Sequence, residues 1–283
     1  DLGAESGRAV LGKYDGSRLV VEELHRFPNG PVAVRGTMYW NVLRIFEELR
    51  AGLAKTLAAT DGHLASVGVD TWGVDFALLD DAGALIGNPV HYRDKRTNGI
   101  PETVFEIVPK REVYEQTGIQ FMQINTLYQI YSIVSANAAQ LKGARTFLMM
   151  SDLMNYYLCG AKVCEFTNAT TTSMYNPRTG TWATQMLDRL GIPTRMLPEI
   201  VPPGTVLGSL DRELWAGRSV HVIAPACHDT GAAVAAVPGR GTNWAYLSCG
   251  TWSLLGFETS QPIITEESYR YNITNEGGVN NTF

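Results

Sequence analysis

The chain has 283 residues, enough to bury a sizeable core in one large domain or in one domain and part of another. Its 45% apolar and 18% charged residues are the ordinary balance of a soluble globular protein. A net charge of -5 argues against a nucleic-acid partner, and no apolar run approaches the ~20 residues of a membrane span.

The cysteine pattern predicts neither a zinc site nor a disulfide framework. The four cysteines form no C-x-x-C pair and do not group with the five histidines. A reducing cytoplasm is therefore the expected location. The cysteines are Cys159, Cys164, Cys227 and Cys249.

Strands and helices alternate along the chain, which predicts an α/β fold with a mixed sheet. Strands are expected over 8–11 and 19–24, before an amphipathic helix over 41–59 whose apolar residues recur every three or four positions. Strands over 64–70, 76–79 and 84–86 come next, followed by helices over 127–141, 152–158 and 186–190. The last predicted elements are a strand over 220–226, a small-residue helix over 229–237 and a strand over 245–248.

A run of Pro and Gly after Val237 predicts a domain boundary there. Residues 1–237 would form the first domain, and 238–283 would begin a second one. The chain opens without an initiator Met and stops after a turn-rich stretch, so we expect it to be a segment of a longer polypeptide.

Two glycine-rich turns have the character of phosphate sites. In each, a turn with glycine and hydroxyl residues leaves backbone N–H groups free to approach an anion. Either turn by itself fits a plain β-turn equally well, but the pair on opposite sides of the boundary could clamp one phosphate chain. The turns are Asp1-Leu2-Gly3-Ala4-Glu5-Ser6-Gly7-Arg8 and Leu247-Ser248-Cys249-Gly250-Thr251-Trp252-Ser253.

Asp229 stands where a buried strand gives way to a helix. Ligands of open α/β sheets collect at such strand ends, and the helix dipole favours an ionised carboxylate. An ionised carboxylate can take the proton of a hydroxyl during phosphate transfer. The competing interpretation is that Asp229 is an ordinary helix N-cap. For His228 it is that the ring is only a hydrogen-bonding neighbour of the aspartate.

Two further stretches could face a substrate. In Asp70-Thr71-Trp72-Gly73-Val74-Asp75-Phe76, Gly73 would let the backbone approach a sugar and Trp72 offers a ring face. The alternative is a β-bulge with Trp72 in the core. The charged stretch from Tyr92 to Thr97 fits either a solvated loop or a substrate rim.

Together these stretches resemble the carbohydrate kinases named for a Phe-Gly-Gly-Tyr signature. The resemblance covers the whole chain and is closest to the branch that phosphorylates L-rhamnulose, because of residues 70–76 and 250–253. It implies the ATPase fold of actin and hexokinase, with a ribonuclease H-like mixed sheet, flanking helices and a truncated second domain. Further matching segments are Tyr92-Arg93-Asp94, residues 167–172 and Asn275-Glu276-Gly277-Gly278.

The resemblance implies transfer of the γ-phosphate of Mg·ATP to the C1 hydroxyl of L-rhamnulose, in rhamnose catabolism, with Asp229 as the base. Predicted sugar contacts are Gly73, His228, Asp229 and Thr230, with Trp72 and Asp75 as further candidates. Predicted ATP contacts are Ala4, Glu5, Ser6, Gly7, Arg8, Gly250 and Thr251, and Asp1 would hold Mg²⁺ through water.

Two other functions stay open at this level. One is a kinase for a different ketose, such as L-fuculose or a pentulose, and the other is a non-catalytic sugar-sensing module on the same fold. The chain also departs from the family pattern, because Glu5 replaces a common small hydroxyl residue, Cys249 a common Ser and Gly231 a common Ala. Adenine contacts and a further sugar-binding Asn would lie beyond Phe283.

Overall fold

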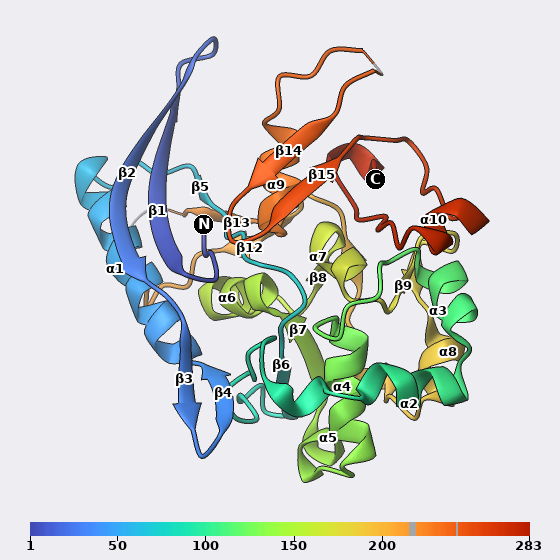
Figure 1. Ribbon diagram of the computed structural model, residues 1–283. Helices are drawn as coiled ribbons and strands as arrows, with labels where there is room; N and C mark the ends of the chain where they lie inside the picture. Colours follow the sequence, from blue (N-terminus) through green and yellow to red (C-terminus); the bar gives the residue numbers. More distant parts are fainter. Residues whose placement is uncertain (215–218, 242) are drawn as a thin grey trace.

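The computed structural model describes residues 1–214, 219–241 and 243–283. Figure 1 shows a long N-terminal hairpin flanked by a helix, a central region of strands and helices, and a C-terminal hairpin above it. Parallel and antiparallel strand pairs occur together, so the architecture is mixed α/β, as predicted.

The N-terminal third forms two antiparallel pairs and a long helix. Residues 6–14 pair with residues 19–28 in the first antiparallel hairpin, and residues 31–34 pair with residues 37–40 in the second. The elements are β1 (Ser6–Tyr14), β2 (Leu19–Pro28), β3 (Pro31–Val34), β4 (Thr37–Trp40) and α1 (Val42–Ala59).

Helix α1 forms because its apolar stripe has a surface to cover. Asn41 caps its first turn by accepting from Arg44 N at 3.2 Å, and Val42, Ile45 and Leu53 are buried. The helix packs on β1 and β2 (Figure 1). The predicted amphipathic helix is confirmed.

Two apolar clusters lie on opposite faces of the pair formed by β6 (Phe76–Leu79) and β7 (Thr146–Met149). Phe76 and Leu78 belong to one cluster, and Ala77 and Leu79 belong to the other. This division follows from the alternation of side chains along a strand. Because both faces are covered, β6 reads as a continuous apolar run.

Short elements complete the middle of the chain. Of the strand predicted over 64–70, only β5 (Ser66–Val67) forms a hydrogen-bonded ladder. The helix predicted over 127–141 is divided into two helices. The other elements are α2 (Ile100–Ile107), α3 (Lys110–Thr117), α4 (Thr126–Ser135), α5 (Ala139–Gly143), α6 (Met150–Cys159), β8 (Cys164–Glu165), α7 (Phe166–Thr171), β9 (Tyr175–Asn176), β10 (Thr181–Trp182), α8 (Thr184–Arg189), β11 (Ile200–Val201), β12 (Val206–Ser209) and β13 (His221–Ile223), with 3-10 turns at Lys95–Thr97, Thr194–Met196 and Val279–Asn281.

The last part of the chain contains α9 (Asp229–Ala235), β14 (Tyr246–Cys249), β15 (Ser253–Gly256) and α10 (Glu266–Arg270). After the β14–β15 hairpin the chain returns to the earlier part. Tyr114 donates to Ile273 O at 2.7 Å, and Asn275 N donates to Gly118 O at 2.9 Å. Within the described ranges, no helix is both long and apolar enough to cross a membrane.

Candidate active site

Three chain segments that are far apart in sequence meet as neighbouring extended strands. Leu2 pairs with Thr71, and Thr71 pairs with His228, both in parallel orientation. Asp229 N continues the pairing by donating to Thr71 O at 2.9 Å. Because the three segments run in parallel, the turns that follow them open at the same edge.

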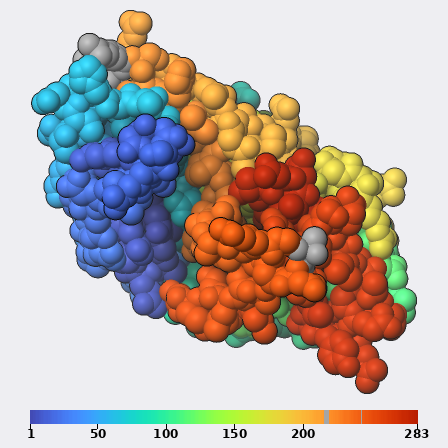
Figure 2. Space-filling view, turned by 90° about the horizontal axis from the view of Figure 1, so that it is seen from above, coloured from blue at the N-terminus to red at the C-terminus, as the bar shows by residue number. Residues whose placement is uncertain are grey.

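A cavity of about 400 Å³ lies at this edge. Figure 2 shows the N-terminal hairpin in blue and the segment after Val237 in orange and red on the two sides of a furrow. Both glycine-rich turns contribute to the cavity wall. The predicted site residues that line it are Asp1, Ala4, Glu5, Ser6, Arg8, Trp72, Gly73, His228, Asp229, Thr230, Gly250 and Thr251.

Asp229 is the first residue of α9 and its side chain is 39% exposed, toward the cavity. One carboxylate oxygen, Oδ1, accepts from Thr230 N at 2.6 Å and from Thr230 Oγ1 at 3.3 Å. The described residues make no hydrogen bond to the other oxygen, Oδ2. A carboxylate held by one oxygen and open at the other can accept a proton from a bound hydroxyl.

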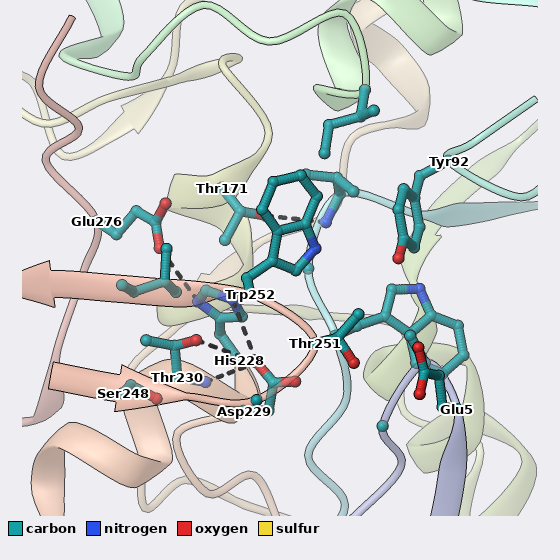
Figure 3. A pocket seen from close by; sticks show the side chains of 18 of the residues that line it. Glu5, Tyr92, Thr171, His228, Asp229, Thr230, Ser248, Thr251, Trp252 and Glu276 are labelled. Carbon is teal, nitrogen blue, oxygen red and sulfur yellow. Dashed lines mark hydrogen bonds and ion pairs between the residues drawn. The ribbon is translucent and has the colours of Figure 1, made fainter. Parts of the chain in front are cut away.

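His228 lies between two carboxylates (Figure 3). Its Nε2 is 3.5 Å from Asp229 Oδ1, and its Nδ1 is 3.3 Å from Glu276 Oε2. The ring is nearly buried, with 8% of the residue exposed. Glu276 belongs to the last segment of the chain, so a residue about 50 positions further along the sequence helps to order His228.

The first glycine-rich turn is closed by short hydrogen bonds. Gly3 N donates to Ser6 O at 2.9 Å, and Asn29 Nδ2 donates to Gly3 O at 2.8 Å. Gly7 does not line the cavity. It lies against Phe27, where a Cβ would come within 2.2 Å of the ring, so its place in the structure is explained by packing.

Asp1 offers one carboxylate to the cavity. Its side chain is 38% exposed, and its Oδ2 is 3.4 Å from Arg8 Nε. The described residues contain no group of three or more His, Cys, Asp or Glu that could enclose a metal ion. Since Mg²⁺ commonly uses one or two carboxylates together with water and substrate phosphates, the carboxylate of Asp1 fits the predicted role.

Asp75 lies beneath the cavity instead of in its wall. The buried carboxylate accepts from Trp40 Nε1 at 2.5 Å, Trp72 Nε1 at 3.0 Å and Gln129 Nε2 at 2.9 Å. Burial raises the pKa of Asp75 to about 6, against the opposing effect of these donors. Its position supports the residues above it and gives it no direct access to a ligand.

Trp72 is largely a core residue. It is only 6% exposed, and its ring centroid is 4.0 Å from that of Trp40. The indole N–H is already used by Asp75. Trp72 therefore combines the two interpretations that the sequence left open, because it packs in the core and presents a small surface to the cavity.

One wall of the cavity was not predicted from the sequence. It comes from the loop between α3 and α4 and consists mainly of apolar side chains, with no motif to mark them. Trp252 adjoins the predicted Gly250–Thr251 pair, and Thr171 and Glu276 stand in matching segments, so these three had a usable signal. The unpredicted lining residues include Ile119, Gln120, Met122, Ile124, Asn125, Thr171, Trp252 and Glu276.

Comparisons with known proteins agree with the geometry. The chain is 42% identical over 281 residues to a rhamnulokinase of Oceanobacillus iheyensis, covering 98% of this chain and 59% of that protein. It is also 42% identical to a rhamnulokinase of Bacteroides thetaiotaomicron, covering 100% of this chain and 59% of that protein. The chain thus spans about 59% of the length of these curated relatives.

Solved structures show the same fold. A xylulose kinase from Lactobacillus acidophilus superposes with a TM-score of 0.84 at 18% identity, over 94% of this chain and 55% of that one. A gluconate kinase from the same organism gives 0.83 at 19% identity, with the same coverage. These similarities confirm the predicted actin- and hexokinase-like fold class.

The family is shown by a direct match. The model of the N-terminal domain of the FGGY family of carbohydrate kinases matches residues 1–236, which is most of the chain. The chain therefore belongs to the FGGY family of carbohydrate kinases.

Proposed function

We propose that the protein transfers the γ-phosphate of ATP to the C1 hydroxyl of L-rhamnulose, with Asp229 as the general base. The observation that carries this proposal is the cavity itself, where Asp229 and both glycine-rich turns meet. The relatives named rhamnulokinase, which are similar along the whole chain, support the choice of sugar. In this proposal, residues 1–237 bind the sugar and 238–283 begin the nucleotide-binding part.

The proposed reaction needs one proton acceptor and a positioned phosphate. The C1 hydroxyl would give its proton to the open Oδ2 of Asp229 while its oxygen attacks the γ-phosphorus. The bond from that phosphorus to the β–γ bridging oxygen breaks, and ADP leaves with the electron pair. Bound Mg²⁺, held on the phosphates near Asp1, would supply charge neutralisation.

The other residues of the cavity have positioning roles in this proposal. Backbone N–H groups around Ala4 and Thr251 would face the phosphates from opposite sides. His228 and Thr230 hold the catalytic carboxylate by its first oxygen. All four cysteines are free thiols, which supports the proposed cytoplasmic location.

Asp229→Asn tests the base. We expect the variant to bind ATP normally and to lose at least ~100-fold in turnover with L-rhamnulose, as is usual when a general base is removed. The measurement is a coupled assay of ADP formation in the intact protein, with nucleotide affinity determined separately. Turnover close to that of the wild type would remove Asp229 from this role.

A panel of ketoses separates this proposal from the two other functions. We expect phosphate transfer to L-rhamnulose to exceed transfer to L-fuculose and D-xylulose. A preference for another ketose would keep the kinase and change its substrate. ATP hydrolysis that no ketose affects would instead favour a sensing module.

A further inference from the structure

A buried carboxylate lies directly behind the segment that carries Asp229. Glu165 is fully buried at the start of α7. Its oxygens accept from Thr167 N at 2.9 Å, Asn168 N at 3.3 Å and Thr167 Oγ1 at 2.5 Å. These three bonds form an N-cap of α7.

Glu165 also makes a bond that the cap does not require. Its Oε2 accepts from Cys227 N at 3.0 Å, across 62 positions in the sequence. The adjacent N–H, that of His228, donates to Thr167 Oγ1 at 3.0 Å. Two consecutive peptide N–H groups before Asp229 are thus held by side chains of one short segment.

This arrangement takes the place of a neighbouring strand. Residues 227–229 pair on one side with Thr71, through Thr71 N to Cys227 O at 2.8 Å and Asp229 N to Thr71 O at 2.9 Å. The N–H groups of Cys227 and His228 donate to the side chains of Glu165 and Thr167 and to no strand of the described chain. Asn168 Nδ2 adds a third contact, to Cys227 O at 3.0 Å.

An ionised Glu165 is suited to accept the hydrogen bond from Cys227 N. Burial raises the pKa of Glu165 and raises that of its neighbour Asp152 well above its usual range. Four donors surround the Glu165 carboxylate, whereas Asp152 Oδ2 is buried without a partner. The proton that burial favours therefore belongs on Asp152, and the four donors around Glu165 leave Glu165 as an acceptor.

We propose that Glu165 and Thr167 are positioning residues for the catalytic base, which fix the main chain of residues 227–228 and thereby the direction of the Asp229 side chain. Thr167 connects Glu165 to the segment before Asp229, because its hydroxyl donates to Glu165 and accepts from His228 N; we call this hydrogen-bonded connection the relay. The inference rests on the proposed role of Asp229.

Thr167→Val tests the relay in the intact protein. Valine keeps the shape and removes the hydroxyl, so His228 N loses its acceptor. We expect kcat for phosphate transfer to fall ~10-fold or more, because small displacements of a catalytic group are costly, while KM for ATP stays within ~2-fold. Thr167→Ser, which restores the hydroxyl, should recover most of the turnover.

Thr172→Val is the matched control for loss of a buried threonine hydroxyl. Thr172 is fully buried just after α7, and its hydroxyl bonds Ala169 O and Met174 N, away from residues 227–229. We expect it to lower thermal stability without the fall in kcat. An equal fall in kcat in Thr172→Val, or none in Thr167→Val, would overturn the proposal.

A double variant separates this inference from the proposed function. If Thr167 acts through Asp229, adding Thr167→Val to Asp229→Asn should reduce the residual turnover by less than ~2-fold. A full additional ~10-fold loss would show that Thr167 acts elsewhere. Wild-type turnover in Asp229→Asn itself would refute the proposed base, whatever Thr167→Val does.

Discussion

At the scale of single residues, two aspartates in similar sequence surroundings have opposite environments. Asp75 and Asp229 each follow an apolar strand, and the sequence indicated a site role for both. Asp229 is 39% exposed at the cavity, whereas Asp75 is fully buried under two indole rings. Local sequence shows that a carboxylate stands near a strand end, and only the fold decides whether water reaches it.

Burial of Asp75 predicts a pH-dependent stability. Its pKa is about 6 in the folded protein, against the usual 3.8, so between these values the unfolded chain ionises and the folded protein keeps its proton. This group therefore stabilises the fold at low pH, and the contribution is lost as the pH rises from about 4 to about 6. The full difference is roughly 3 kcal/mol.

Asp75→Asn removes this titration. We expect the variant to be more destabilised relative to the wild type at pH 4.5 than at pH 7, by roughly 2 kcal/mol, because part of the full difference is already lost at pH 4.5. Urea unfolding of both proteins at the two pH values measures it, and other acidic groups cancel in the comparison. The same loss at both pH values would show that Asp75 titrates normally.

At the scale of elements, long periodic segments were predictable and short ones were not. The helix at α1 and the strand at β6 match their predictions, since each has a clear apolar pattern. Helices α2 and α3 were missed, because each has only eight residues and α3 is mostly polar. The segment over 64–70 was predicted as one strand, but only Ser66–Val67 forms a ladder, and of its apolar residues only Val69 is buried.

A substitution in the turn between β14 and β15 should weaken ligand binding without lowering the stability of the fold. A Cβ added at Gly250 would meet no protein atom within 4 Å, although Gly250 lines the cavity. Gly250→Ala should therefore leave the unliganded protein as stable as the wild type. We expect it to weaken ATP binding ~10-fold, the equivalent of one hydrogen bond to a charged group.

Gly30→Ala is the control for this turn. A Cβ there also has open space, and Gly30 does not line the cavity. Thermal unfolding with and without ATP compares the two variants, because a bound ligand raises the melting temperature according to its affinity. An ATP-induced shift that Gly250→Ala leaves unchanged would place the phosphates away from this turn.

At the scale of the whole molecule, the unpredicted cavity wall depends on contacts between distant segments. The loop from Gly118 to Asn125 is held by hydrogen bonds to residues after position 260. No local sequence pattern indicates that these two segments contact each other. Asn272 Oδ1 accepts from Phe121 N at 2.7 Å, and Asn275 Nδ2 donates to Gly118 O at 2.9 Å. The wall could not be predicted because its position is fixed by the tertiary fold.

Asn275→Ala tests whether the late segment controls this wall. Asn275 is buried, and its side chain also accepts from Ile263 N at 2.6 Å, so the variant leaves buried groups unpaired. We expect a loss of roughly 1–3 kcal/mol in the free energy of unfolding. The sugar KM should rise more than kcat falls, because Asp229 is anchored independently through Thr71.

Asn98 provides the control for Asn275→Ala. Asn98→Ala removes an exposed amide that makes no hydrogen bond to the described residues, so it should change neither stability nor KM. Measurements of unfolding and of sugar kinetics in the intact protein compare the two variants. If Asn275→Ala lost stability but kept the wild-type KM, the loop would hold its shape without the late segment. The sugar side of the cavity would then belong entirely to residues before Val237.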